Sequence, residues 1–406
     1  MSVFKDHKIS ANNLLQYIPE ALLTHLSSTT KVDYYSKTLH GKKVFYLLLY
    51  AILDNEKLSQ RTLEDTFNGS VFKALFNLDE SETVRRSSIS ERLSRIDSGY
   101  FQKIFECIYN RFAEYYSPTE INKYNLIRVD STIVSEASGR LKEGIDQRNG
   151  KKYIKYSVSF DGILPSDIEI FNSQSYSGED YALPEIVLKQ VKKDPAHRNI
   201  YLIDRGVKSG RMMKSFNENS IMFVIRSNEN RKHEEIKSLI TENQNLDLGE
   251  LVLVKDSVVQ LYGNTPINNK KGNKHYKEQK IETPFRIVIA KDKKQPGKEF
   301  WFLTNDFELT AKEVADYYKA RWDIEVFFRF IKQELNVSHL VSLNKNGIEV
   351  MIYMTLIVAM LILIYKKANN LGYKTAKRRL TIEIRELAIA LMITLSGGNP
   401  NLLFKT

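Results

Sequence analysis

Residues 125–134 read Asn-Leu-Ile-Arg-Val-Asp-Ser-Thr-Ile-Val, and residues 199–206 read Asn-Ile-Tyr-Leu-Ile-Asp-Arg-Gly. The first stretch is rich in β-branched residues, which predicts a strand that contains Asp130. The second begins as a short, fully apolar strand of the kind buried at the centre of a sheet, and Asp204 ends it. If one sheet holds both strands, it brings the two carboxylates side by side. Hard oxygen ligands of this type select Mg²⁺ or Mn²⁺.

The segments between these two stretches indicate the fold class. Residues 153–160 and 163–171 predict two further strands, joined by a turn at Asp161-Gly162. Residues 180–191 predict a helix. The order is therefore strand, strand, strand, helix, strand. Three antiparallel strands followed by a crossover to a central strand form the opening of a ribonuclease-H-like fold, a mixed sheet with helices.

Composition and periodicity divide the rest of the chain. Strands predominate from residue 218 to residue 308, where the one short helix is expected at residues 234–241. The predicted regions are a helical N-terminal domain at 1–120, a first part of the ribonuclease-H-like core at 121–217, a β-rich insertion at 218–308, a second part of the core at 309–370, and a basic helical C-terminal segment at 371–406.

The distribution of charge suggests a polyanionic partner. The 406 residues carry a formal net charge of +11, yet residues 1–120 hold 15 basic and 15 acidic side chains. The surplus is densest at residues 270–298, which begin with Lys270, Lys271 and Lys274. Nucleic acid is the first candidate for such a partner. A solvated loop is the alternative interpretation of this basic run.

Several classes of protein are excluded by what the sequence lacks. The single cysteine, Cys107, rules out a disulfide framework and a cysteine-based zinc site. No charged and then apolar segment opens the chain, so we expect no secretory signal and a cytoplasmic, nucleoid-associated protein. The chain has no G-x4-G-K-[ST] loop, so no nucleotide cofactor is expected.

A helix predicted from Thr310 to about Leu335 carries the remaining polar constellation. Tyr318, Arg321, Glu325 and Lys332 fall within an arc of about 60° on one face of such a helix. A solvated face with ion pairs between successive turns is one interpretation. In the functional interpretation Glu325 completes the metal site, and the other three side chains bind phosphates.

The spacing Tyr318-x2-Arg321-x3-Glu325-x6-Lys332 resembles the signature of bacterial insertion-sequence DDE transposases of the cut-and-paste type. Residues 129–132 resemble the first-aspartate segment of that family, and residues 204–206 resemble the second. The family usually has an aromatic residue soon after the second aspartate, whereas Val207 follows Gly206 here.

The resemblance implies a site in which Asp130, Asp204 and Glu325 are catalytic and hold two Mg²⁺ or Mn²⁺ ions. Arg205 joins the DNA-binding set of Tyr318, Arg321 and Lys332. The implied partners are double-stranded DNA, as terminal inverted repeats and target DNA, and a second copy of the chain in a synaptic homodimer. The resemblance also implies that the helical N-terminal domain at 1–120 is a DNA-binding domain that recognises the terminal repeats. The implied reaction cleaves the element ends and joins their 3′-hydroxyls to target DNA.

An aromatic residue of the insertion is also implied to stack on a flipped base. Phe300 and Trp301 are the two candidates, and alternation along a strand places them on opposite faces. A stacked aromatic residue contributes about 1–3 kcal/mol per base. Packing of the strand in a core is the competing explanation for both residues.

Other functions remain open from the sequence alone. A domesticated DNA-binding protein could keep the same fold, and so could a metal-dependent nuclease without strand transfer. A peripheral membrane protein is a third possibility, because residues 350–365 form an apolar run of sixteen residues. A membrane span needs about 20 apolar residues, so a fully buried helix is the better interpretation of this run.

Overall fold

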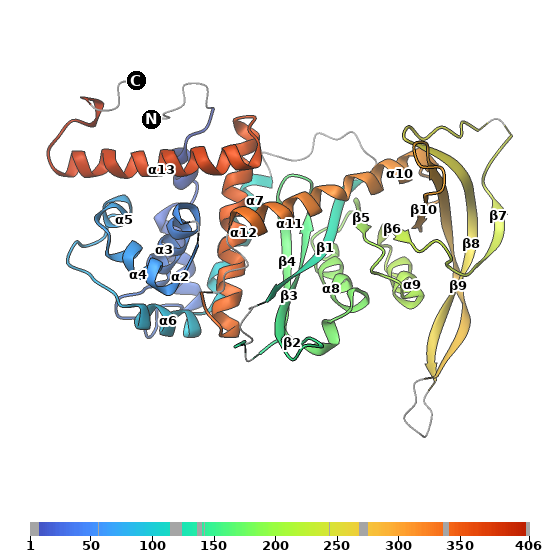
Figure 1. The fold of residues 1–406 in the computed structure, drawn as a ribbon, viewed down its shortest axis with the longest axis horizontal. Coiled ribbons are helices and arrows are strands. Elements are labelled where there is room, and N and C mark those ends of the chain that lie inside the picture. The colour runs from blue at the N-terminus through green and yellow to red at the C-terminus, as the bar shows by residue number, and fades with distance from the viewer. Residues whose placement is uncertain are drawn as a thin grey trace.

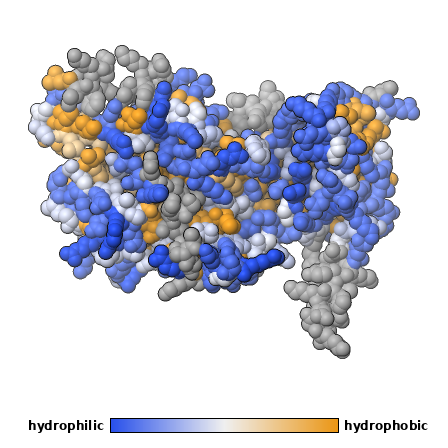
Figure 2. Space-filling view, in the orientation of Figure 1, coloured by the Kyte–Doolittle hydropathy of each residue, from blue (hydrophilic) through white to orange (hydrophobic). Residues whose placement is uncertain are grey.

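The computed structural model describes residues 8–55, 57–113, 124–135, 140–141, 143–242, 244–267, 275–335 and 341–402. The molecule is elongated (Figure 1), with a helical part at one end, a mixed sheet in the middle and a β-rich part at the other end. The surface in Figure 2 is mostly hydrophilic over the β-rich part, and hydrophobic side chains gather in patches over the helical part.

The N-terminal part consists of helices, as the sequence predicted. The hydroxyl of Ser59 accepts a hydrogen bond from the backbone N–H of Thr62 at 3.1 Å, which caps one of these helices. The helices are α1 (Ala11–Gln16), α2 (Glu20–Thr30), α3 (Gly41–Asp54), α4 (Gln60–Asn68), α5 (Ser70–Leu75), α6 (Arg86–Arg95) and α7 (Ser98–Ala113).

The central sheet has the predicted opening of antiparallel strands followed by a crossover. Strand β1 pairs antiparallel with β3, and β3 pairs antiparallel with β4. After helix α8, strand β5 pairs parallel with β1, and β6 pairs parallel with β5. The elements are β1 (Asn125–Ser135), β2 (Ile145–Asp146), β3 (Lys152–Phe160), β4 (Pro165–Phe171), α8 (Glu179–Val191), β5 (Asn199–Ile203), α9 (Gly210–Glu218) and β6 (Met222–Ser227), with a 3₁₀ turn at Gln174–Tyr176.

The β-rich insertion extends the same sheet. Strand β10 pairs antiparallel with β6 and with β9, and β9, β8 and β7 follow in order. The parallel strand β6 therefore belongs to the central sheet, although its residues lie beyond the predicted boundary at 217. Strand β6 is apolar and pairs with β5 on one edge and with β10 on the other, so it is an interior strand of this sheet. The strands are β7 (His233–Ser238), β8 (Leu251–Ile267), β9 (His275–Asp292) and β10 (Glu299–Thr304).

One element of the insertion was predicted wrongly. Residues 233–238 form strand β7 rather than part of a short helix, and they pair antiparallel with β8. Ladder hydrogen bonds to β8 and an ion pair of 2.7 Å between Lys255 and Glu235 are available only in the extended form. Tertiary pairing therefore overrides the local preference of this polar segment.

The C-terminal third returns to helices. Helix α12 is apolar all round, and 94% of its most apolar 18-residue window is buried. Among the residues that the structure describes, it is the one helix long and apolar enough to cross a membrane. It packs against α3, α6 and α7 and against β4 of the sheet. The helices are α10 (Ala311–Ala320), α11 (Trp322–Glu334), α12 (Lys345–Ala368) and α13 (Tyr373–Leu395), followed by a 3₁₀ turn at Pro400–Leu402.

Candidate active site

The two predicted aspartates occupy equivalent places on neighbouring strands. Val129 of β1 pairs with Ile203 of β5 in parallel register, so Asp130 and Asp204 are the next residues of the two strands. Neighbouring strands lie about 4.8 Å apart. The register thus sets the two carboxylates side by side at the point where β5 ends, as the sequence predicted.

The helices α10 and α11 complete this site from one side of the sheet. Arg321 lies between two of the carboxylates, with its Nη1 3.8 Å from Oδ2 of Asp130 and its Nη2 paired with Oε1 of Glu325. The hydroxyl of Tyr318 donates to Oδ1 of Asp204 at 3.4 Å. Asp130, Asp204, Tyr318, Arg321 and Glu325 therefore form one connected cluster.

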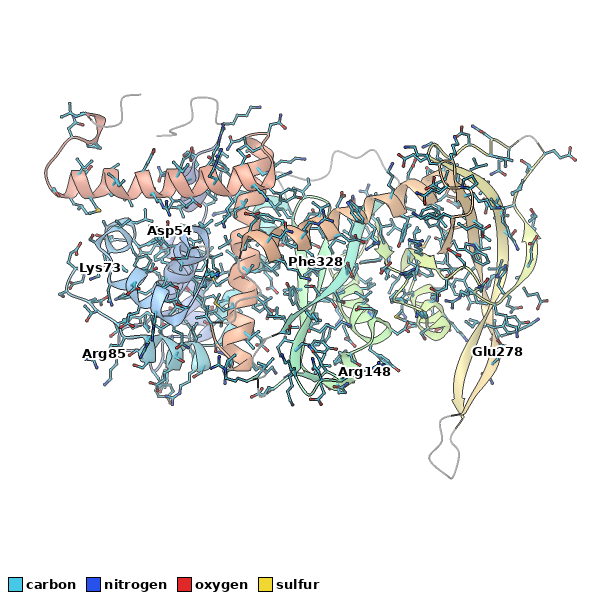
Figure 3. All side chains as sticks on the ribbon, viewed as in Figure 1. Asp54, Lys73, Arg85, Arg148, Glu278 and Phe328 are labelled. Carbon is cyan, nitrogen blue, oxygen red and sulfur yellow. The ribbon has the colours of Figure 1, made fainter. Side chains whose placement is uncertain are left out.

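Lys332 lies farther along the same helix. It shares with Asp130 and Glu325 a groove of ≈ 400 Å³, to which Thr132 and Arg329 also contribute. Burial lowers the pKa of Lys332, and the charge of Asp130 acts in the opposite direction. Arg329 is exposed at this groove and adds a second cation that the four-residue signature does not contain. Phe328, which is labelled in Figure 3, lies on the same helix. Its ring packs against Tyr156 of β3, which fixes the helix to the sheet.

The structure separates the two aromatic candidates of β10. Phe300 lines a cavity of ≈ 610 Å³ whose wall also includes Tyr318, Arg321, Trp322 and Glu325. Two cations lie over the Phe300 ring, Arg226 at 4.9 Å and Lys298 at 5.1 Å from the ring centroid.

Trp301 points to the other face of the sheet, as strand alternation predicted. It packs against a separate hydrophobic cluster and lies edge-on to His233 at a centroid distance of 5.8 Å. Its Nε1 donates to Glu299 at 2.9 Å. Both rings are half-buried and pack at the edge of a hydrophobic cluster, so core packing, the competing explanation from the sequence, applies to both, and only Phe300 also lines the cavity beside Arg321 and Glu325.

A fourth carboxylate, Glu179, lies at the site although the sequence analysis did not single it out. Its Oε2 accepts from the hydroxyl of Ser131 at 2.7 Å, and its Oε1 pairs with the buried Lys155 at 2.8 Å. A Cβ on Gly206 would come within 2.7 Å of the Glu179 side chain, so the segment after Asp204 packs closely on it. A glycine two residues after the second aspartate was the signal for this close approach.

The surroundings of Asp130 compensate its negative charge only partly. Burial raises the pKa of Asp130 to about 6, against opposing contributions from the Ser131 N–H and from Arg321, and Asp204 and Glu179 raise it further. Among the described residues, no three histidine, cysteine or carboxylate side chains converge closely enough to hold a metal. The donor set is nonetheless the oxygen type that Mg²⁺ prefers, and a divalent ion would supply the positive charge that Asp130 lacks.

We predict that Asp130→Asn stabilises the metal-free protein at neutral pH. The pKa of Asp130 is about 6 in the folded chain against 3.8 ordinarily. In the pH window between these two values the folded state therefore holds a proton that the unfolded state has lost. Stability is therefore lost as the pH rises through this window, and asparagine avoids the loss. In EDTA at pH 7.5 we expect a gain of about 1–2 kcal/mol.

Thermal melts at pH 7.5 and pH 3.5 test this expectation, because the difference should vanish at the lower pH. Asp146→Asn is the control, because Asp146 is exposed and pairs with Lys152 at the surface. This variant should change the thermal stability little at either pH. Lower stability of Asp130→Asn than of the parent at pH 7.5 would contradict the prediction.

The remaining predicted contacts have different outcomes. Lys270, Lys271 and Lys274 lie outside the described residues. Arg205 is exposed beside Asp204. In the N-terminal helices, Arg92 donates to the carbonyls of Leu39 and Val32 and so braces the fold.

An N-terminal groove of ≈ 1110 Å³ is lined by exposed arginines. Arg61 of α4 and Arg86 of α6 both lie at its wall, together with residues 341–344, which precede α12. Arg85, labelled in Figure 3 at the lower edge of the helical part, immediately precedes α6 and is also exposed. The groove therefore presents positive charge beside the start of α12.

The mixed central sheet, with two aspartates at neighbouring strands and a glutamate on the facing helix, is the arrangement expected of a DDE enzyme. The family model "Transposase DDE domain" matches residues 121–361, so the chain belongs to this family of enzymes. A solved structure of the piggyBac transposase, in a synaptic complex with hairpin DNA, has a similar fold, with a TM-score of 0.51 at 12% identity, over 96% of this chain and 82% of that one.

Two curated proteins are similar in sequence. A probable transposase for insertion sequence element IS5377 from Geobacillus stearothermophilus is 29% identical over 54% of this chain and 51% of its own length. A putative transposase for insertion sequence element IS4SA from Synechocystis is 27% identical over 84% of this chain and 85% of its own length. The chain thus spans about half the length of the first relative and most of the second.

Proposed function

We propose that the protein moves an insertion sequence by cut-and-paste transposition, cleaving the element ends and joining their 3′-hydroxyls to target DNA. The observation that carries this proposal is the connected cluster of Asp130, Asp204, Glu325, Tyr318 and Arg321 on adjacent strands and a facing helix pair. The two similar proteins, named as a probable and a putative transposase for insertion sequence elements, support the same reaction.

Asp130, Asp204 and Glu325 would hold two Mg²⁺ or Mn²⁺ ions. Such ions activate the attacking oxygen and stabilise the leaving oxygen in phosphoryl transfer. Arg321 pairs with Glu325 and lies near Asp130, so its guanidinium lies among the carboxylates that would hold the ions. Glu325 would exchange part of its interaction with Arg321 for the metal.

The cationic side chains would bind the substrate backbone. Arg321 can hold a phosphate with two parallel N–H donors, and Lys332 can hold another as a point charge in the adjoining groove. The Tyr318 hydroxyl keeps its proton, since burial raises its pKa to about 12, and it can donate to a phosphate oxygen. In each step a water or a 3′-hydroxyl forms the new bond to phosphorus, and the bond to the opposite oxygen breaks.

Phe300 is the proposed stacking partner for an unpaired base at the cleaved end. The cavity that it lines opens directly beside Arg321 and Glu325. Arg226 and Lys298, which lie over its ring, could hold the neighbouring phosphates. Trp301 has no comparable access to this cavity.

Recognition of the terminal repeats is assigned to the N-terminal groove with Arg61 and Arg86. Basic residues 270–298 of the insertion would add salt-sensitive contacts to the DNA backbone without reading sequence. The active species is proposed to be a homodimer on paired ends that acts on the nucleoid and needs no nucleotide cofactor.

The test is a reaction on linear DNA that carries the sequences flanking the gene. We expect Mg²⁺-dependent cleavage at the inverted repeats and covalent joining of the released ends to a target plasmid. Cleavage without joining would favour a nuclease. Binding without cleavage would favour a domesticated DNA-binding protein.

A further inference from the structure

Arg128 is a charged residue in the middle of the apolar strand β1, two positions before Asp130. Its side chain is only 4% exposed, and its guanidinium reaches across to the helices that carry the signature residues. Nε donates to the carbonyl of Ala320 at 3.1 Å, and Nη2 pairs with Oδ2 of Asp323 at 3.0 Å. Ala320 ends α10, and Asp323 is the second residue of α11.

The hydrogen-bond ladder of the helix predicted from Thr310 to about Leu335 is interrupted between these two contacts, although Arg321 itself keeps helical backbone angles (φ −58°, ψ −25°). We call this interruption the break. Arg321 lies at the break, and its N–H donates three residues back, to Tyr318, at 3.0 Å. The N–H of Ile324 likewise donates to the carbonyl of Arg321 at 3.3 Å. In a continuous α-helix the N–H of Ile324 would bond the carbonyl of Ala320. Arg128 now donates to that carbonyl.

The rest of the guanidinium is held by the sheet. Nη1 donates to the carbonyls of Leu126 at 2.6 Å and Asp161 at 3.1 Å. Gly162 has φ +101°, and a Cβ there would lie 2.8 Å from Nη1, so any other residue at this turn would be strained and would displace the guanidinium. A buried charge is costly unless it is paired and hydrogen-bonded, and these contacts meet that need.

We propose that Arg128 is a positioning residue of the active site, which holds the break between α10 and α11 and thereby places Arg321 between Asp130 and Glu325. Arg321 is the residue at the break itself, so the direction of its side chain depends on how the end of α10 and the start of α11 are fixed. Arg128 fixes both, and it lies on β1, the strand that also carries Asp130. Its contacts therefore hold the strand part and the helix part of the site in place relative to each other. This inference rests on the proposed function, because it takes Asp130, Arg321 and Glu325 to be parts of one active site.

The sequence supplies a spectroscopic probe of this junction. The chain has two tryptophans, and Trp322, the first residue of α11, is 54% exposed. In a Trp301→Phe parent, Trp322 alone reports on the junction. We expect Arg128→Lys, which keeps the charge but lacks the fork, to change acrylamide quenching of Trp322 by about twofold or more. Mn²⁺ affinity of the DNA-free protein, followed by calorimetry, should fall at least about tenfold.

Two further variants make the result specific. Asp323→Asn should change both readouts in the same direction by a smaller factor, and it serves if Arg128→Lys does not fold. Arg286→Lys is the matched control, because Arg286 is a buried arginine that pairs with Asp256 at 2.7 Å and donates to the carbonyl of Leu309, before the start of α10 and at the opposite end of that helix from the break. It should lower thermal stability but leave Trp322 quenching and Mn²⁺ affinity within twofold.

The outcomes separate the possibilities. Unchanged quenching in Arg128→Lys, or changed quenching with unchanged Mn²⁺ affinity, would overturn the positioning role. Equal effects in Arg286→Lys would reduce the finding to general destabilisation and would also overturn it. If the parent binds no Mn²⁺, the metal assignment of the proposed function fails, and the quenching comparison still decides whether Arg128 holds the junction.

Discussion

Glu325→Gln will bind terminal-repeat DNA as tightly as the parent and cleave it about 10³-fold more slowly or worse. Glutamine keeps the shape of the side chain and an oxygen that can accept from Nη2 of Arg321, so the junction should remain intact. It removes the negative charge needed for a divalent ion. Metal-ion stabilisation of the transition state is worth several kcal/mol, and each 1.36 kcal/mol is a factor of ten in rate.

Single-turnover cleavage and gel-shift binding, measured on the same DNA, test this result. Glu334→Gln is the matched control, because Glu334 ends the same helix and pairs with Lys374 at 3.6 Å, away from the carboxylate cluster. We expect its cleavage rate to stay within twofold of the parent. Cleavage by Glu325→Gln at a comparable rate would remove Glu325 from the metal site.

The sequence was sufficient for those parts of the site whose geometry follows from local pattern. Asp130 and Asp204 could be placed side by side because each ends or interrupts an apolar strand, and parallel pairing of those strands then sets the register. The spacing of Tyr318 and Arg321 relative to Glu325 survives the helix break, since one residue in a turn hardly changes the angular order along the axis.

Features that depend on partners distant in sequence could not be predicted from that pattern. The helix break at Arg321 is bridged by Arg128, which lies almost two hundred positions earlier, and residues 310–335 contain no proline or glycine to signal it. A buried arginine within an apolar strand was the available clue, since such a charge requires partners. Strand β7 likewise depends on β8, and Glu179 on its contact with Ser131.

The predicted boundary at residue 120 hides a shared core. Residues of α1 to α7, such as Phe45 and Phe105, belong to the same hydrophobic cluster as Ile357 of α12 and Tyr156 of β3. Most of helix α12 belongs to the matched transposase domain, which ends at residue 361, yet the N-terminal helices α1, α3, α6 and α7 pack against it. The N-terminal region therefore contributes to the stability of the catalytic part as well as to the proposed recognition of DNA.

A chain that begins at residue 121 will consequently be insoluble or aggregated. It will not fold into a stable catalytic domain that has lost only its specificity for the terminal repeats. Removal of α3, α6 and α7 would expose a helix that is apolar on every side. Each large apolar side chain moved back into water costs about 1.5–3 kcal/mol, and a whole domain is stable by only about 5–15 kcal/mol. Exposing a few such residues of α12 is enough to remove that margin.

Size-exclusion chromatography and binding of a hydrophobic dye measure this outcome. Co-expression of residues 1–120 with residues 121–406 is the control, and it should restore a soluble complex because the missing helices return to α12. A soluble, cooperatively unfolding 121–406 fragment would show that α12 does not need this cover. End recognition should therefore be tested with Arg61→Ala and Arg86→Ala in the full chain, since both side chains are exposed at the groove and their loss leaves the shared core intact.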